Sequence, residues 1–191
     1  MLKSLLFDAP LEFELTDSCE IDLINPCIHD GPWFAGGMAR KMYTKSSEPI
    51  SDYDVWCKST EQFELLAERI RATMHFGEYY TENAITFVCY SDGSRKIQLI
   101  RRICNSPDDV ISLFDFTVCQ VVTDTRHFVL GPSTARDLNT KTLKLASQPL
   151  KPNCIPRIVK YVTYGFKPDS TLLESVNINT GEIEWRSQLT Y

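Results

Sequence analysis

Two pairs of residues in the first third of the chain have types and spacing that could do chemistry together: Gly36 with Gly37, and Asp52 with Asp54. A glycine pair at the junction of a strand and a helix lets the backbone come close to a ligand, and the free amides at the helix start then form an anion site suited to phosphate. Alone, such a pair more often marks a simple turn. Arg40 and Lys41 follow in the first turns of the expected helix and add two cations.

The two aspartates favour a ligand site over a simple turn. Side chains two positions apart in a strand point to the same face, so Asp52 and Asp54 project together while Tyr53 and Val55 face the opposite layer. Like charges at that separation are costly unless a cation lies between them or both face water. Mg²⁺ prefers a few carboxylate oxygens completed by water and substrate phosphate. The alternative is a turn position for Asp52 and a solvated strand face for Asp54.

A third carboxylate, Asp115, stands between two phenylalanines in "LFDFTVCQ", at the start of an apolar, strand-like run. A charge there needs a partner. Three aspartates on neighbouring strands, opposite a helix start that cradles phosphate, would form a two-metal clamp for in-line attack on a nucleotide phosphate. The sequence therefore predicts a site made of Asp52, Asp54 and Asp115.

The carboxyl-terminal part offers a second cluster. Arg157, Lys160, Tyr161 and Tyr164 fall at i, i+3, i+4 and i+7, so they share one face of a helix that ends at Gly165. Two cations and two aromatic rings on one face could neutralise a triphosphate and stack against a base or sugar. An ordinary surface face with tyrosines at its edge fits the same pattern.

The elements that must position these residues alternate between helix and strand, with no internal repeat and no low-complexity linker. A capping box of Ser59 and Gln62 opens the best-defined helix, and residues 91–94 form the turn of a hairpin. Strands are predicted at 33–35, 52–56, 84–90, 96–103 and 114–122, and helices at 37–43, 59–74, 106–114, 132–145 and 156–164.

Composition limits the possible functions. The 191 residues are 43% hydrophobic, enough for one sizeable core, and no segment has the form of a signal peptide or a membrane span. Residues 1–30 carry a net charge of −6 and the other 161 sum to +1, which argues against a protein that grips long nucleic acid by its phosphates. Seven cysteines without a CxxC pair indicate reduced thiols and a cytoplasmic protein.

These residues resemble the DNA polymerase β-like nucleotidyltransferase superfamily. The resemblance rests on Ala35-Gly36-Gly37, on Asp52-Tyr53-Asp54-Val55 and on Asp115. It is closest to small nucleotidyltransferases encoded by tailed phages, through "FDFTVCQ" and "RIVKYVTYGF". The core motif covers residues 33–58 and the looser similarity extends to about residue 166. The interval between the glycines and the first aspartate is longer than usual, and Met38 stands where a polar residue is common.

The resemblance implies an α+β fold with a mixed, palm-like sheet flanked by helices and a small helical carboxyl-terminal part. It divides the chain into an acidic segment (1–30), a catalytic core (31–130) and a helical nucleotide- or acceptor-binding part (131–191).

The resemblance also implies roles for the residues. Gly36 and Gly37 would hold the β and γ phosphates of a nucleoside triphosphate. The aspartate pair would bind two Mg²⁺ or Mn²⁺ ions, and Asp115 would bind the catalytic ion and help activate the attacking hydroxyl. From the residue pattern itself, the nucleotide is also expected to contact the cations and the ring described above, namely Arg40, Arg157, Lys160 and Tyr161.

The implied reaction is transfer of a nucleoside monophosphate from a triphosphate such as ATP to a hydroxyl, most simply on a tRNA-like RNA end, with release of pyrophosphate. Transfer to a protein or a small molecule, and a non-catalytic nucleotide-binding module that acts through a partner, are the alternatives. The expected location is the cytoplasm, that of the host for a phage-encoded protein, with no membrane partner.

Overall fold

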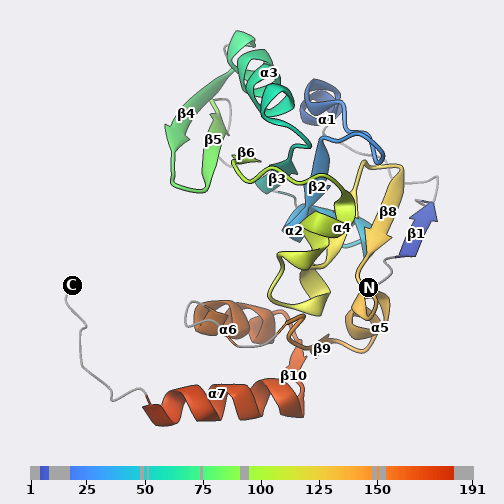
Figure 1. Cartoon of the computed structure of the whole chain (residues 1–191), viewed down its shortest axis with the longest axis vertical. Helices are drawn as coiled ribbons and strands as arrows, with labels where there is room; N and C mark the ends of the chain where they lie inside the picture. The colour runs from blue at the N-terminus through green and yellow to red at the C-terminus, as the bar shows by residue number, and fades with distance from the viewer. Residues whose placement is uncertain are drawn as a thin grey trace.

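The structure is a computed structural model that describes residues 5–8, 18–47, 50, 52–73, 75–90, 95–147, 150 and 154–182. Its centre is an eight-stranded mixed sheet with the strand order β1-β8-β7-β2-β3-β6-β5-β4 (Figure 1). The strands are β1 Leu5–Asp8, β2 Trp33–Ala35, β3 Asp52–Trp56, β4 Phe76–Tyr80, β5 Ala84–Cys89, β6 Lys96–Ile100, β7 Val121–Thr123 and β8 His127–Leu130.

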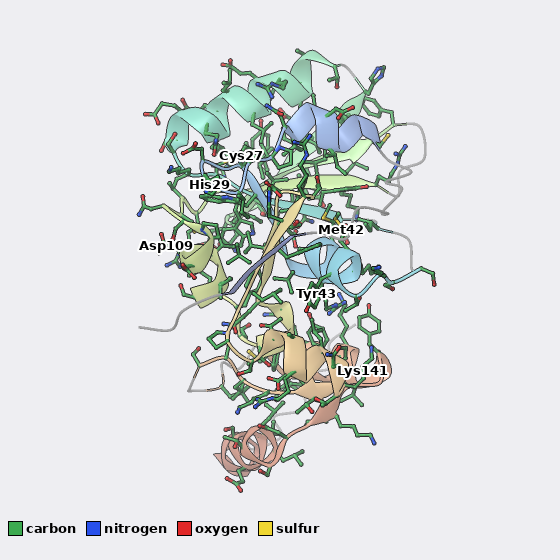
Figure 2. The ribbon with its side chains drawn as sticks, turned by 90° about the vertical axis from the view of Figure 1, so that its right-hand side faces the viewer. Cys27, His29, Met42, Tyr43, Asp109 and Lys141 are labelled. Atoms are coloured by element: carbon green, nitrogen blue, oxygen red, sulfur yellow. The ribbon has the colours of Figure 1, made fainter. Side chains whose placement is uncertain are left out.

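Helices flank this sheet and extend the molecule beyond it. They are α1 Ser18–Ile24, α2 Gly36–Tyr43, α3 Thr60–Ala72, α4 Pro107–Ser112, the 3-10 turn η1 Thr117–Cys119, α5 Thr134–Asn139, α6 Ile155–Thr163 and α7 Ser170–Glu182. A second, two-stranded parallel sheet joins β9 Thr142–Leu143 to β10 Lys167–Pro168. Figure 2 shows α1 and α3 at one end of the molecule and α7 at the other. The expected α+β class is confirmed.

The sheet buries both faces around its central strands. On one face, Phe34, Tyr53 and Val55 pack with residues of α1, α2 and α3 in the larger hydrophobic core. On the other face, Trp33 and Ala35 pack with residues of α4 in a smaller core. Strand β2 runs antiparallel to β3, and β3 runs parallel to β6. The chain passes from β2 directly into α2, whose buried apolar residues belong to the larger core.

Local signals account for most of the predicted elements. The Ser59 hydroxyl accepts a hydrogen bond from the Gln62 amide and begins α3, and the Ser106 hydroxyl does the same for the Asp109 amide at the start of α4. Gly165, with φ +82°, follows the end of α6. Strands β5 and β6 pair antiparallel as the expected hairpin, whose turn at 91–94 lies outside the described residues.

The strand predicted at 114–122 is wrong over most of its length. After a bend at Asp115, Phe116 makes an isolated bridge to Leu145, and η1 follows before β7 begins. The cause is the environment of Thr117, whose amide donates to the Lys144 carbonyl and whose hydroxyl donates to Asp137. These long-range bonds replace the ladder that an extended strand would form.

The helix predicted at 132–145 is also shorter than expected. Only α5 is helical, because Lys141 adopts a left-handed φ of +53° and the chain then enters β9. No element was predicted at β1, α1, β4, β8 or α7. The boundaries proposed at residues 30 and 130 stay predictions. Among the described residues, every helix is too short or too polar to cross a membrane.

Candidate functional site

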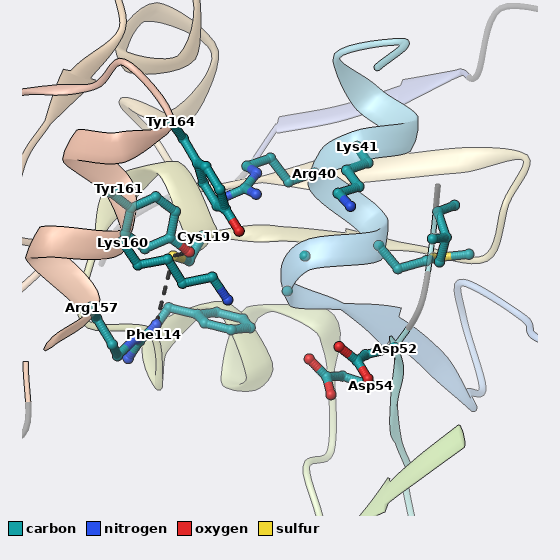
Figure 3. Close-up of a pocket in the computed structure, with 14 residues that line it drawn as sticks. Arg40, Lys41, Asp52, Asp54, Phe114, Cys119, Arg157, Lys160, Tyr161 and Tyr164 are labelled. Atoms are coloured by element: carbon teal, nitrogen blue, oxygen red, sulfur yellow. Dashed lines mark hydrogen bonds between the residues drawn. The ribbon is translucent and has the colours of Figure 1, made fainter. Parts of the chain in front are cut away.

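A cavity of about 260 Å³ lies where α2, β3, the segment before η1 and α6 meet (Figure 3). It combines backbone glycines, two carboxylates, four cations and several aromatic rings. Its lining comprises Gly36, Gly37, Met38, Arg40, Lys41, Ile50, Asp52, Asp54, Phe114, Cys119, Arg157, Lys160, Tyr161 and Tyr164. The structure thus brings together every predicted site residue except Asp115.

The backbone conformation requires a glycine at position 36, whereas position 37 has room for a side chain. Gly36 has φ +73°, and a Cβ there would lie 2.7 Å from Oδ2 of Asp54. Gly37 is exposed, and a Cβ there would meet no atom within 4 Å. Ala35, the residue that caps α2, offers no side-chain hydrogen bond to the first amides. The open amino terminus of α2 can therefore accept an anion at its amides.

Substitution of the two glycines should separate these roles. We expect Gly36→Ala to lower the free energy of unfolding by about 1–3 kcal/mol, because the left-handed backbone is strained for alanine and the new methyl group meets the Asp54 carboxylate. Gly37→Ala should leave stability within about 0.5 kcal/mol of wild type. Urea unfolding of both variants measures this difference. Equal decreases in the free energy of unfolding would show that position 37 does not tolerate a side chain either.

Asp52 and Asp54 lie on the face of β3 opposite Tyr53 and Val55, as their spacing predicts. Asp52 is exposed and Asp54 is half-buried. Burial, and next the negative charge of Asp52, raise the pKa of Asp54 to about 6, although the positive charges of Lys160 and Arg157 oppose the shift. This carboxylate pair is therefore under electrostatic strain that a cation would relieve.

A pH dependence of stability follows for the metal-free protein. Because the folded state raises the pKa of Asp54 to about 6, the folded protein holds this proton more tightly than the unfolded chain, and stability falls between about pH 4 and pH 6 as pH rises. We expect Asp54→Asn to unfold with a free energy about 1–3 kcal/mol higher than wild type above pH 7, with the difference vanishing near pH 4. Urea unfolding from pH 4 to pH 8 measures it.

Asp124 provides the contrasting control. Burial alone would raise its pKa, but hydrogen bonds from His127 and from the amides of His127 and Arg126 lower it. Asp124→Asn should therefore destabilise the protein at pH 7. Destabilisation by Asp54→Asn at pH 7 would mean that Asp54 is a structural residue as well.

Asp115 does not join the other two aspartates. Its carboxylate forms an ion pair with Arg157, and the part of the chain that the structure describes contains no group of three acidic, histidine or cysteine residues arranged to hold a metal ion. The predicted three-aspartate clamp is therefore not assembled. Asp52 and Asp54 are the two carboxylates in the cavity lining.

Arg40 is the most deeply buried cation in the cavity lining. The residue is only 9% exposed, and its guanidinium lies over the rings of Tyr161 and Tyr164, at 5.1 and 5.7 Å from their centroids. Within the described residues, the guanidinium makes no ion pair and no hydrogen bond. A buried cation is costly without an anionic partner, and the cavity is where such a partner would bind.

The predicted face of α6 does line the cavity. Figure 3 shows Arg157, Lys160 and Tyr161 on the side away from Asp52 and Asp54. Burial raises the pKa of Tyr161, whose hydroxyl lies 2.9 Å from the Cys119 sulfur. Three further lining residues were not predicted, and their types alone carried no signal: Ile50, Phe114 and Cys119.

Charge divides the cavity into two sides. Asp52 and Asp54 form an acidic side, while Arg40, Lys41, Arg157 and Lys160 supply cations around the rest of the lining. Carboxylate oxygens are the ligands that Mg²⁺ prefers, and guanidinium, ammonium and free amide groups suit phosphate oxygens. The residues present therefore fit a divalent cation bound together with a polyphosphate.

Solved structures share this fold at low sequence identity. The CCA-adding enzyme of Thermotoga maritima in complex with tRNA superposes with a TM-score of 0.70 at 14% identity, over 94% of this chain and 47% of that one. The Bacillus stearothermophilus CCA-adding enzyme in complex with CTP gives a TM-score of 0.63 at 13% identity, over 88% and 45%. The fold is therefore that of CCA-adding nucleotidyltransferases, of which this chain spans about half the length.

The sequence itself identifies the family. Residues 14–141, more than half of the chain, match the Gabija anti-defense 2 family, so this chain belongs to that family. No curated protein matches the sequence.

Proposed function

We propose that this protein is a metal-dependent nucleotidyltransferase that moves a nucleoside monophosphate from a nucleoside triphosphate to a hydroxyl acceptor. The observation that carries the proposal is the buried Arg40 guanidinium, which lacks an anionic partner among the described residues and faces the same cavity as the Asp52–Asp54 pair. A triphosphate would supply the missing anion, and its metal ion would relieve the repulsion between the two carboxylates.

The glycines, the carboxylates and several cations of the cavity have roles in this proposal. The amides at Gly36 and Gly37 would hold the terminal phosphates, and Arg40, Arg157 and Lys160 would neutralise them. Asp52 and Asp54 would hold Mg²⁺ or Mn²⁺. When bound, the metal would polarise the α phosphate and lower the pKa of the attacking hydroxyl. The ring of Tyr164, which is partly exposed, offers a surface for the base or the sugar.

The acceptor is proposed from the comparisons. The similar structures include complexes with tRNA, with CTP, with ATP and with a primer tRNA, which supports an RNA end as the acceptor. The family name points to a role against the Gabija defence, which supports the expected phage origin and a place in the host cytoplasm. Transfer to a protein or to a small molecule would use the same cavity with a different acceptor.

The experiment is transfer of α-labelled ATP, CTP, GTP and UTP, with Mg²⁺ and then Mn²⁺, into total cellular RNA and protein by wild type and Asp52→Ala. Label in RNA that depends on Asp52 is the expected result and also gives the base preference. Label in protein would identify a protein-modifying enzyme. No label in either would contradict transfer to a macromolecule.

A non-catalytic nucleotide-binding module is the second candidate, because the lining of the described cavity holds two carboxylates and the carboxylate of Asp115 is paired with Arg157. Such a module should gain thermal stability from a nucleoside triphosphate with Mg²⁺ by mass action, without transferring label to any acceptor. A transferase should show both properties.

A further inference from the structure

The contacts of Asp115 give it a role that differs from metal binding. Its carboxylate pairs with Nη1 of Arg157, a residue far along the chain on α6. The Asp115 side chain is 14% exposed and that of Arg157 is 39% exposed, so the pair is partly shielded from water. A carboxylate paired with a guanidinium in such a place contributes more than an exposed pair does.

The Arg157 guanidinium is held on three sides. Besides the Asp115 carboxylate, the Cys119 sulfur lies 3.7 Å from Nη2, and the Phe116 ring centroid lies 5.4 Å from the guanidinium carbon. The backbone of Asp115 is itself fixed, because its carbonyl accepts a hydrogen bond from the Ala146 amide at 2.8 Å. Asp115 therefore offers a carboxylate on a hydrogen-bonded backbone to the long side chain of Arg157.

We propose that Asp115 is a positioning residue, whose carboxylate holds the Arg157 guanidinium over Phe116 in the orientation that receives the phosphate groups of the substrate. The inference rests on the proposed function, since phosphate is the ligand that Arg157 would bind. An arginine that is ordered before the ligand arrives loses less conformational entropy on binding than a free one. Asp115 thus acts through Arg157 and does not itself contact the metal.

The sign of one binding measurement separates positioning from simple charge. Removal of a negative charge beside a phosphate site should tighten nucleotide binding by Coulomb's law alone. Positioning predicts the reverse: Asp115→Asn should raise the Kd of a fluorescent ATP analogue, measured with Ca²⁺ in place of Mg²⁺, by about tenfold. Asp115→Glu keeps the charge, and its Kd for the ATP analogue should lie between those of Asp115→Asn and wild type.

Two further variants complete the design. If Asp115 acts through Arg157, Asp115→Asn should have no additional effect on the Kd in an Arg157→Gln background. Glu78→Gln is the matched control, since it breaks the Arg71–Glu78 ion pair on the outer part of the sheet, away from the cavity, and should leave the Kd unchanged. Thermal unfolding of each variant confirms that the comparison is between folded proteins.

Mn²⁺ binding to the nucleotide-free protein, followed by electron paramagnetic resonance, tests the competing role. Asp115→Asn should bind Mn²⁺ as wild type does, whereas Asp54→Asn should bind it more weakly. A loss of Mn²⁺ affinity in Asp115→Asn would overturn the inference in favour of a third metal ligand. An unchanged or lower Kd for the ATP analogue would also overturn it, and a wild-type protein that binds no nucleoside triphosphate would overturn the proposed function with it.

Discussion

Asp52→Asn and Asp54→Asn should each reduce nucleotidyl transfer at least a thousandfold while the protein stays folded. A metal ion at the α phosphate contributes several kcal/mol to transition-state stabilisation, and loss of one of its two carboxylates in the cavity should remove most of that contribution. Neither substitution removes a packing contact of the larger core, because both side chains lie on the face opposite Tyr53 and Val55.

Initial rates with α-labelled nucleotide, together with urea unfolding of the same preparations, measure both parts of this expectation. Asp108→Asn, on the exposed first turn of α4, is a suitable control because it changes one carboxylate outside the cavity lining. Loss of transfer accompanied by unfolding would make the aspartates structural, and full transfer in either variant would contradict the proposed metal site.

Arg40→Met should give the second large effect, weakening nucleotide binding without lowering the stability of the ligand-free protein. The Kd of a nucleoside triphosphate should rise about a hundredfold, because the substitution removes the buried cation that is proposed to pair with the phosphates. The ligand-free protein should unfold with an unchanged free energy, or with one about 1 kcal/mol higher, since methionine fills similar space without a buried charge. The stacking on Tyr161 and Tyr164 limits this gain.

Fluorescent-nucleotide titration and urea unfolding measure the two quantities. Arg102→Gln serves as the control, because Arg102 is exposed and lies outside the cavity lining. If Arg40→Met destabilised the protein and left nucleotide binding unchanged, Arg40 would be a packing residue, and the main support for an anionic ligand would be lost.

The parts of the site that could be predicted from the sequence are those set by local geometry. Alternation in a strand places Asp52 and Asp54 on one face, and the helical repeat places Arg157 and Lys160 on one face, whatever the rest of the fold does. The junction of β2 and α2 was also predictable from local sequence, because the glycine pair follows directly after an apolar triplet.

The parts that could not be predicted depend on contacts between distant segments. The apolar run around Asp115 has the composition of a strand, but Thr117 bonds to Asp137 and to the Lys144 carbonyl and turns the chain into η1. The pairing of Asp115 with Arg157 then depends on how α6 packs, and so does the burial of Arg40 beneath the α6 tyrosines. No spacing within either segment encodes these contacts.

The amino-terminal strand has a practical consequence for expression and truncation. Strand β1 pairs antiparallel with β8, with Leu5 opposite Leu130 and Asp8 opposite His127. It is therefore an edge strand of the sheet. The region that matches the family begins only at residue 14. A version trimmed to that boundary would keep the cavity but uncover the backbone amides and carbonyls of β8, and such open strand edges recruit a second molecule. Self-association of the trimmed protein is therefore to be expected, and the full chain is the better choice for solution work.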